Sequence, residues 1–441
     1  MAAFHRTVGK LRALAPHDPV RLEAEQVAAS FARDGRLRRR KARGAEVSAA
    51  DAATMAATAT GALDRREDAP LAGPDTDGGD GGGVFQRPRT CYVCKSPYRQ
   101  VDAFYHRLCP DCAADNTARR ALSTDLSGRR ALLTGGRVKI GFQLALMLLR
   151  DGAEVLLTSR FPHDTVRRFH AEPGSAKWLE RLTVLAVDLR DPRQVLGLCE
   201  ELRAEGEPLD ILVNNAAQTV RRPPQSYALL AAGEYDALPE GARPAPGFTP
   251  IRMLEGLGGS VSALPAALRE ADEAGLLPDP APENSWSARL GALDPAEVLE
   301  TQLVNALAPA LLCDRLLPLL LASPRPRRYV VNVTAVEGRF AVRNKMPGHP
   351  HTNMAKAALN MLTRTSAAEL AEQGVHMCAV DTGWITDENP APKKARMAGA
   401  GFRTPLDIVD GAARVYDPIV RGEAGDPVSG VFLKDYREAE W

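Results

Sequence analysis

Four cysteines carry the clearest chemical signal in this sequence. They form two Cys-x2-Cys pairs separated by fourteen residues, Cys91 with Cys94 and Cys109 with Cys112. Two such pairs can place four thiolates around one Zn²⁺ at about 2.3 Å. Because protein sulfur would fill all four positions, the metal would be structural and not catalytic. We therefore predict a zinc-ribbon module over residues 86–117, with unpaired thiols or two disulfides as the alternative.

A glycine-containing segment gives the second signal. Residues 129–141 read RRALLTGGRVKIG, a short apolar run followed by glycines and a helix-forming stretch. Backbone N–H groups and a helix N-terminus in this context can bind the pyrophosphate of a dinucleotide. The segment therefore predicts a nucleotide site at the end of a strand.

The elements that must position this site alternate along the chain. From residue 126 onward, short apolar runs alternate with helix-length segments, which is typical of a parallel sheet. The expected strands lie at about 130–134, 154–159, 182–187, 209–214, 328–334, 375–381 and 429–434. The expected helices lie at about 140–151, 191–204, 296–321, 353–373 and 406–420. We predict an α/β fold, a doubly wound parallel Rossmann-type sheet with helices on both faces, over residues 124–441.

A series of short motifs follows along about residues 126–440. In chain order they are Thr134-Gly135-x3-Lys139-x-Gly141, Asp188 at the end of the third strand, Asn214-Asn215-Ala216-Ala217, Asn305 on a helix, Lys356, and Thr382-Gly383 with Thr386. In this order they resemble the TGxxxGxG, the adenine-contacting Asp, the NNAG, the helix Asn, the Lys of Tyr-x3-Lys and the Pro-Gly…Thr stretch of the short-chain dehydrogenase/reductase family. The resemblance implies an NAD(P)H-dependent oxidoreductase that transfers hydride between a carbonyl and an alcohol.

The resemblance also implies a set of cofactor contacts. They are Thr134, Gly135, Arg137, Lys139, Ile140, Gly141, Ser159, Arg160, Asp188, Leu189, Asn215, Ala216, Lys356, Gly383 and Thr386. Ser159 and Arg160 end the second strand where NAD enzymes usually place an acid, so NADP is favoured and NAD is less expected. The alternative is that Arg160 is an ordinary surface arginine. Lys139 replaces the family's second glycine, and its side chain either blocks the backbone from the pyrophosphate or supplies a charge to it.

The acid/base groups depart from the family. Counting back from Lys356 places Thr352 at the position of the family's Tyr, and Ala335, preceded by Thr334, at that of its Ser. A threonine hydroxyl ionises far above the phenol's pKa of about 10 and cannot replace it as an acid. In the family the Lys holds the nicotinamide ribose and the helix Asn anchors a water, which are the roles implied for Lys356 and Asn305.

We expect the proton to come from the loop at 348–351. Imidazole, with a pKa of about 6.5, is a competent acid or base at neutral pH. His351 is the first choice and His349 the second, ahead of Glu337 and Asp387, and the alternative is that backbone groups satisfy each ring. The predicted catalytic set is therefore Lys356, Asn305, His351, Thr352 and Thr334.

Two segments lie outside the nucleotide-binding pattern. Residues 1–85 form a basic, Ala/Gly-rich extension, in which positions 1–44 carry eleven Lys/Arg against four Asp/Glu, and 73–83 predicts a flexible linker. The basic part would meet nucleic acid or another anionic surface, or form a solvated helix end. Residues 218–295 are rich in Pro and Gly and predict an irregular insertion acting as a substrate lid. Arg221 and Arg222 at its start would recognise an anionic small-molecule substrate.

The whole chain has 441 residues, a formal charge of +1, 45% hydrophobic and 25% charged residues, which are ordinary globular values. No apolar run approaches the ~18 residues of a membrane span, and seven cysteines are too few for a disulfide framework. We expect a cytoplasmic protein with no membrane partner.

The family's frequent dimers and tetramers imply a homo-oligomer. The alternative to an enzyme is a catalytically silent NADP-binding protein that acts as a sensor or scaffold through its zinc ribbon and basic N-terminus, by contact with protein or nucleic acid.

Overall fold

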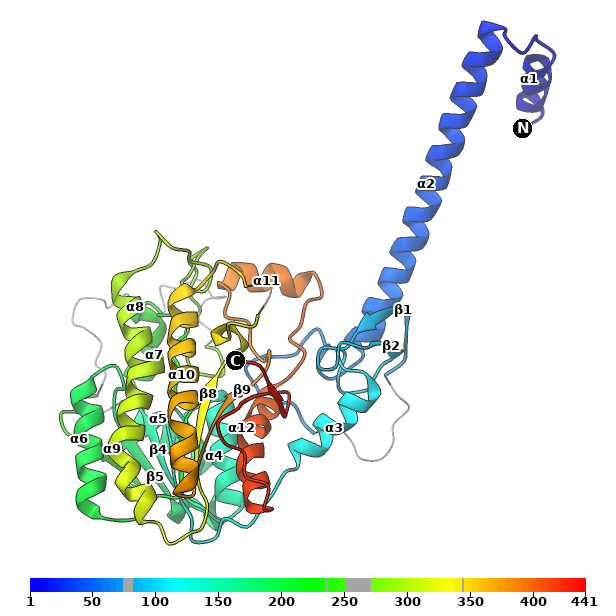
Figure 1. Ribbon diagram of the computed structural model, residues 1–441. Coiled ribbons are helices and arrows are strands. Elements are labelled where there is room, and N and C mark those ends of the chain that lie inside the picture. Colours follow the sequence, from blue (N-terminus) through cyan, green and yellow to red (C-terminus); the bar gives the residue numbers. More distant parts are fainter. Residues whose placement is uncertain (74–81, 235–236, 251–270, 343–344) are drawn as a thin grey trace.

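A nine-stranded sheet forms the centre of the protein in this computed structural model, which describes residues 1–73, 82–234, 237–250, 271–342 and 345–441 (Figure 1). The spatial order is β11-β10-β9-β8-β6-β3-β4-β5-β7, and every pairing is parallel except that between β10 and β11. The strands are β3 Arg130–Leu133, β4 Glu154–Ser159, β5 Leu182–Ala186, β6 Ile211–Asn214, β7 Ala242–Pro244, β8 Arg328–Thr334, β9 Val375–Asp381, β10 Phe432–Lys434 and β11 Arg437–Ala439. The seven expected strands are thus confirmed to within three residues at each end.

Helices cover both faces of this sheet, as the doubly wound prediction requires. One face packs against α4 (Lys139–Arg150), α5 (Pro162–Ala171) and α12 (Ile408–Glu423). The other face packs against α6 (Pro192–Glu205), α9 (Ala308–Ala322) and α10 (Pro350–Glu372). The strands are rich in Val, Leu and Ile because both of their faces are buried.

The helix expected at 296–321 contains a change of winding. It runs as α8 (Pro295–Gln302), a π-helical turn over Leu303–Leu307, and α9. The expectation that no apolar run approaches the length of a membrane span is wrong for this segment, because 295–322 is long and apolar enough by length and composition. Half of its most apolar stretch is buried within the protein. Its buried leucines, Leu312, Leu316, Leu319 and Leu320, pack in the core under α6.

The four-cysteine module is a hairpin and a short helix. β1 (Val84–Thr90) pairs with β2 (Pro97–Gln100), and α3 (Pro110–Arg120) follows. Its buried aromatic residues share one core with Ile385, Leu406 and Ile408 of the domain that contains the nine-stranded sheet. The module is therefore packed onto that domain by apolar contacts.

The N-terminal extension is more ordered than its composition indicates. After α1 (Ala2–Arg12), α2 (Pro19–Ala56) forms a single long helix that projects from the body (Figure 1). Its start has a local cause, because Asp18 caps the helix by accepting from the Val20 N–H and Pro19 occupies the first turn. Residues 57–73 pack on the body, where Arg65 donates to the Thr404 and Leu406 carbonyls. Positions 74–81 of the expected linker lie outside the described residues.

The 218–295 insertion has only short elements in its described part. These are a 3-10 turn over Pro224–Tyr227, α7 (Ala228–Ala231) and β7, which extends the sheet beside β5. Positions 235–236 and 251–270 of the expected lid lie outside the described residues.

Candidate active site

A cleft of about 400 Å³ opens where the strand order reverses. From β3 the chain continues to β4 and β5 on one side and to β6 and β8 on the other, so the loops after β3 and β6 diverge. In open α/β sheets such a crevice at the carboxyl ends of the strands is where ligands bind. Most residues that line this cleft come from the ends of β3, β4, β5 and β6, and the insertion, the π-helical turn and Glu388 complete it.

The glycine positions of the loop after β3 are required by close packing. A Cβ on Gly135 would lie 2.8 Å from the Cα of Ala216, and one on Gly141 would lie 2.2 Å from the Gly135 carbonyl oxygen. Lys139 has φ +55°, the left-handed conformation that favours glycine. The lysine thus adopts a backbone conformation that favours glycine while adding a cation to the cleft.

Polar contacts fasten this loop to the end of β6. The Asn215 side chain donates to the carbonyls of Thr134 and Gly135 at 3.1 and 3.0 Å. The Thr134 hydroxyl accepts from the N–H groups of Asn215 and Ala216, both at 3.0 Å. Four of the predicted cofactor residues therefore form one rigid rim.

The end of β4 presents a cation without a carboxylate partner. The Arg160 guanidinium lies 5.6 Å from the ring centre of Phe161 and 5.7 Å from that of Tyr227. No salt bridge to Arg160 is formed within the described residues, and Ser159 Oγ accepts from the Phe161 N–H at 3.0 Å. Arg160 is thereby held at the cleft with its charge available to an anion.

Asp188 and Leu189, at the end of β5, also line the cleft. Burial opposes ionisation of the Asp188 carboxyl, but hydrogen bonds from Arg190, the nearest at 2.6 Å, together with the charge of Arg160, hold its pKa below the ordinary value. The carboxylate is therefore largely neutralised by Arg190 before any ligand binds.

Arg137 has a different position from that of Arg160. Its guanidinium donates to Asp164 at 2.6 Å and to the Ala274 carbonyl at 2.8 Å, and it lies over the Phe161 ring. Although it lines the cleft, its charge is already paired within the protein.

Sequence reasoning missed Glu388, which lies at the mouth of the cleft. Its carboxylate lies 3.7 Å from Lys139 Nζ and accepts from the Thr386 hydroxyl at 3.0 Å. Burial raises the pKa of this group, but the charges of Lys139, Lys394 and Arg222 outweigh burial and lower it to about 2. Nothing in the run 386–389 marks this residue, because two of its three cations, Lys139 and Arg222, come from distant segments.

Lys356 on α10 is buried beside β8. Its Nζ donates to the Val333 carbonyl at 2.8 Å, and burial lowers its pKa from 10.5 to about 8, against the opposing charge of Glu337. The Thr334 hydroxyl donates to the Lys356 carbonyl at 3.4 Å. The Thr352 hydroxyl is buried and has no hydrogen-bond partner in the described part of the chain. Three predicted catalytic residues therefore lie together at this end of β8.

Asn305 lies in the π-helical turn and holds the loop after β6. Its Oδ1 accepts from the Gln218 N–H at 2.7 Å and its Nδ2 donates to the Gln218 carbonyl at 2.9 Å. π-Helical turns often occur at functional sites. The side chain is fully used by this backbone, so it positions the wall of the cleft.

The two histidines of the 348–351 loop face the insertion. His351 is 1% exposed, both of its ring nitrogens lack a partner among the described residues, and it lines a separate cavity of about 230 Å³ with residues of the 283–298 segment. The His349 ring stacks on Trp286 at 3.9 Å, and its Nδ1 lies 2.9 Å from the Trp286 carbonyl oxygen. Adjacent helix residues point about 100° apart, which turns His351 away from the direction of Thr352. None of the residues lining the His351 cavity lines the cleft.

Glu337 follows β8 and interacts electrostatically with Lys356, His349 and Asp381. Burial raises its pKa, and the charge of Asp381 adds to this rise. By contrast, Asp387 accepts from the Asn389 N–H at 2.9 Å within its own loop. Of the two predicted reserve acids, Glu337 is the one placed beside the buried lysine.

The two arginines after β6 differ in availability. Arg221 pairs with Asp294 at 3.3 Å and with Glu300 at 3.4 Å. Arg222 lines both the cleft and an adjoining cavity of about 390 Å³. Arg222 is therefore the better placed of the two for an anionic ligand.

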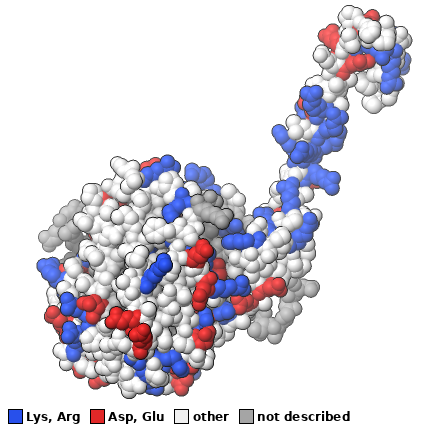
Figure 2. Space-filling view, in the orientation of Figure 1, with Lys and Arg blue, Asp and Glu red and all other residues white. Residues whose placement is uncertain are grey.

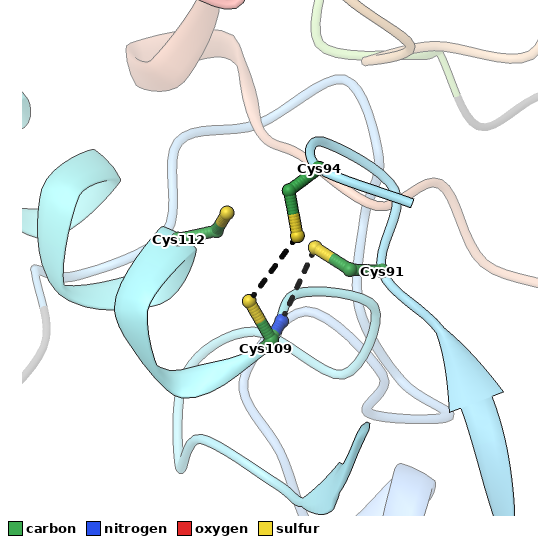
Figure 3. Close-up of side chains that lie close together, drawn as sticks. All are labelled: Cys91, Cys94, Cys109 and Cys112. Atoms are coloured by element: carbon green, nitrogen blue, oxygen red, sulfur yellow. Dashed lines mark hydrogen bonds between the residues drawn. The ribbon is translucent and has the colours of Figure 1, made fainter. Parts of the chain in front are cut away.

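The four predicted metal ligands lie together (Figure 3). Their sulfur atoms all lie within 4.8 Å of one another, and Cys94 Sγ is 3.6 Å from Cys109 Sγ. A tetrahedral site with bonds of about 2.3 Å separates its sulfurs by about 3.8 Å, so the donor set fits Zn²⁺. His106 is hydrogen-bonded to the Thr60 hydroxyl at 2.7 Å, outside the set.

The cysteine module reaches the domain that contains the nine-stranded sheet through Tyr92. The Tyr92 hydroxyl, one residue after the first cysteine, accepts from the Trp384 N–H at 2.9 Å. Trp384 follows Gly383, which has φ +84° and donates from its N–H to Asp381 at 3.0 Å. The loop that contains the predicted cofactor residues Gly383 and Thr386 is thus held by the module.

Comparison with known proteins agrees with this geometry. The sequence matches two family models, "short chain dehydrogenase" over residues 129–232 and "Enoyl-(Acyl carrier protein) reductase" over residues 280–400. It is 33% identical to an uncharacterized protein of Acanthamoeba polyphaga mimivirus over 346 residues, which is 75% of this chain and 71% of that protein. It is 33% identical to the short-chain dehydrogenase/reductase pyiH of Pyricularia grisea over 107 residues, 22% of this chain and 41% of the relative. A solved short chain dehydrogenase from Burkholderia cenocepacia in complex with NADP is 22% identical, with a TM-score of 0.47, covering 70% of this chain and 97% of that one.

Proposed function

Because the chain belongs to the short-chain dehydrogenase/reductase family, we propose that it is an NADP(H)-dependent oxidoreductase that interconverts a carbonyl and an alcohol at a non-standard active site. The observation that carries the proposal is the cleft at the reversal of strand order, where the loop from Gly135 to Gly141 and the start of α4 would receive a pyrophosphate. The bound cofactor would supply the hydride.

The preference for NADP(H) rests on the end of β4. Arg160 faces the cleft between two aromatic rings without a carboxylate partner, and Arg190 neutralises the nearby Asp188. A 2′-phosphate would therefore meet one free guanidinium and no free acid. Calorimetric titration of the full chain with NADPH and with NADH tests this directly, and equal affinities would contradict it.

We propose Glu337 as the proton donor in place of the family's phenol. A carboxyl whose pKa is raised by burial retains its proton nearer to neutral pH and can donate it to a developing alkoxide. The buried Lys356 ammonium would stabilise that oxygen and hold the nicotinamide ribose. Neither Glu337 nor His351, the first choice from sequence, is among the residues that line the cleft. Glu337 is preferred because it interacts electrostatically with Lys356, whereas His351 lines a cavity of the insertion.

The test compares matched variants in a pH-dependent assay of NADPH oxidation with carbonyl substrates. Glu337→Gln should lower kcat by ~10² or more while leaving NADPH affinity unchanged. Asp387→Asn and His351→Gln are the controls and should retain turnover. Full activity of Glu337→Gln together with loss of activity in His351→Gln would identify His351, and not Glu337, as the proton donor.

The substrate is proposed to be anionic. The cavity that adjoins the cleft is lined by five cations and four carboxylates, which are Arg65, Lys139, Arg222, Lys394 and Arg403 with Glu67, Asp68, Asp272 and Asp387. Arg222 also lines the cleft and forms no salt bridge within the described residues, so its charge is available to an anionic substrate. Arg222→Ala should therefore raise KM for a carboxylate-bearing carbonyl compound more than for a neutral one, and an equal change would argue against this class.

We propose that Cys91, Cys94, Cys109 and Cys112 hold one structural Zn²⁺, as their spacing and clustering support. Elemental analysis of protein purified without chelator should give one metal per chain. Protein that is folded and free of metal would contradict this.

We also propose that the enzyme is a homo-oligomer. Leu299, Leu307, Met354 and Met361 are more than half exposed on the neighbouring segments α8, the π-helical turn and α10. Such an apolar patch is typical of a subunit interface. Light scattering should give a mass above that of one chain, and Met354→Glu with Met361→Glu should lower it; a monomeric unaltered protein would contradict the proposal.

The second candidate is a silent NADP(H)-binding member of the family. It is favoured by the loss of both the phenol and the serine hydroxyl, at Thr352 and Ala335. NADPH binding without oxidation by any member of a broad carbonyl panel would support this reading over the enzyme.

A further inference from the structure

The middle of α2 carries a concentrated positive charge. Residues 33–43, called here the basic segment, contain seven cations and one acid, Asp34; the cations are Arg33, Arg36, Arg38, Arg39, Arg40, Lys41 and Arg43. Figure 2 shows them as a band of blue along the projecting helix. All seven are exposed, and the one salt bridge within α2 among the described residues joins Arg21 to Glu25, outside the segment.

The helix holds this segment away from the body. Near its C-terminal end, the buried Asp51 accepts from the Gln86 N–H of β1 at 2.5 Å, which fixes the helix to the cysteine module. From there α2 extends outward, so its middle is open on all sides (Figure 1). At a rise of 1.5 Å per residue the basic segment presents its charges over about 15 Å.

The charges are distributed around the helix. With about 100° between residues, Arg33, Arg36, Arg40 and Arg43 fall on one face. Arg38 falls on the opposite face, and Arg39 and Lys41 fall on the two sides between them. Like charges three or four residues apart destabilise a helix. A bound polyanion would reduce this repulsion between the arginines. A flat anionic membrane would contact one face only, and the segment offers little apolar surface for insertion.

We propose that the basic segment of α2 binds double-stranded DNA. The major groove of B-form DNA is about 12 Å wide and admits an α-helix, with phosphates along both walls. A helix with cations on opposite faces could therefore contact the phosphates on both walls of the groove. The contacts are to phosphates, so the binding is independent of sequence and of the oxidoreductase activity.

The test is fluorescence anisotropy of the full chain with a labelled DNA duplex of mixed sequence. Six phosphate contacts predict a ~10³-fold loss of affinity between 50 and 200 mM salt. The triple variant Arg36→Glu, Arg40→Glu, Arg43→Glu should bind at least ~10²-fold more weakly and reduce the slope of log K against log salt by about 3. An Arg→Gln triple at the same positions, which removes the charge without adding acids to the helix, should weaken binding in the same direction.

A control variant with the same change in net charge separates the segment from the overall charge. It is Arg203→Glu, Arg364→Glu, Arg437→Glu, three exposed arginines on the body, and it should bind like the unaltered protein. The proposal is overturned if no salt-dependent binding occurs at 50 mM salt or if the control loses as much affinity. It is also overturned if duplex RNA, whose major groove is narrow and deep, or anionic phosphatidylserine vesicles bind as tightly as DNA.

Discussion

Lys356→Met should stabilise the protein while removing its activity. Folding lowers the pKa of Lys356 from 10.5 to about 8. At pH 7 the lysine is protonated in both the folded and the unfolded chain, so its burial destabilises the folded protein by about 3 kcal/mol. Methionine removes this cost and also the hydrogen bond to the Val333 carbonyl, which is worth about 1 kcal/mol. The expected net gain in the free energy of unfolding at pH 7 is about 2 kcal/mol.

The pH dependence gives this prediction its sharpest form. The penalty is complete below pH 8 and fades as pH rises toward 10.5, so the stability of the unaltered protein should approach that of the variant in this window. Urea unfolding of both proteins at pH 7 and at pH 10 measures the difference, which should shrink by about 2 kcal/mol. Lys356→Leu is a second apolar control. The description of Lys356 as a cation destabilised by burial would be refuted by a Met variant that is less stable than the unaltered protein at pH 7. It would also be refuted if the difference in the free energy of unfolding between the two proteins did not change with pH.

Three further predictions concern binding. Arg160→Asp should reverse the cofactor preference from NADPH to NADH in calorimetry, and an unchanged order would remove Arg160 from the site. Glu388→Gln should tighten NADPH binding roughly tenfold, because it frees the surrounding cations for the pyrophosphate, whereas weaker binding would mean that Glu388 only positions them. Removal of the predicted metal by a chelator, or Cys112→Ser, should lower both the thermal unfolding temperature and the NADPH affinity, because Tyr92 of the cysteine module holds the Trp384 loop. Unchanged NADPH affinity in metal-free protein would show that the cysteine module does not stabilise the cofactor site.

Local patterns were enough to predict the sheet and the clustering of the four cysteines. Buried parallel strands are short apolar runs. The first cysteine pair lies in a tight turn and the second lies at the start of α3, so each pair is brought together locally. The glycine loop is also local, so the contacts of Gly135 and Gly141 follow from the same few residues that form the motif.

Other features depend on distant segments or on weak signals. The charge around Glu388 comes from three separate parts of the chain, so no local motif contains it. His351 was chosen by its nearness in sequence to Thr352, but helix geometry turns it toward the insertion. The long α2 helix has few periodic apolar residues and two internal glycines, Gly35 and Gly44, and its Ala and Arg content with the Asp18 cap was the available signal.

Hydride transfer is the central claim, and deuterium tracing tests it most directly. The full chain is incubated with NADPH carrying deuterium at its transferable position and with a panel of aldehydes and ketones, and the alcohols are analysed by mass spectrometry. We predict a deuterated alcohol from at least one anionic carbonyl compound with the unaltered protein, and none with Lys356→Met. Unlabelled products throughout, from a protein that binds NADPH, would contradict the assignment as an oxidoreductase.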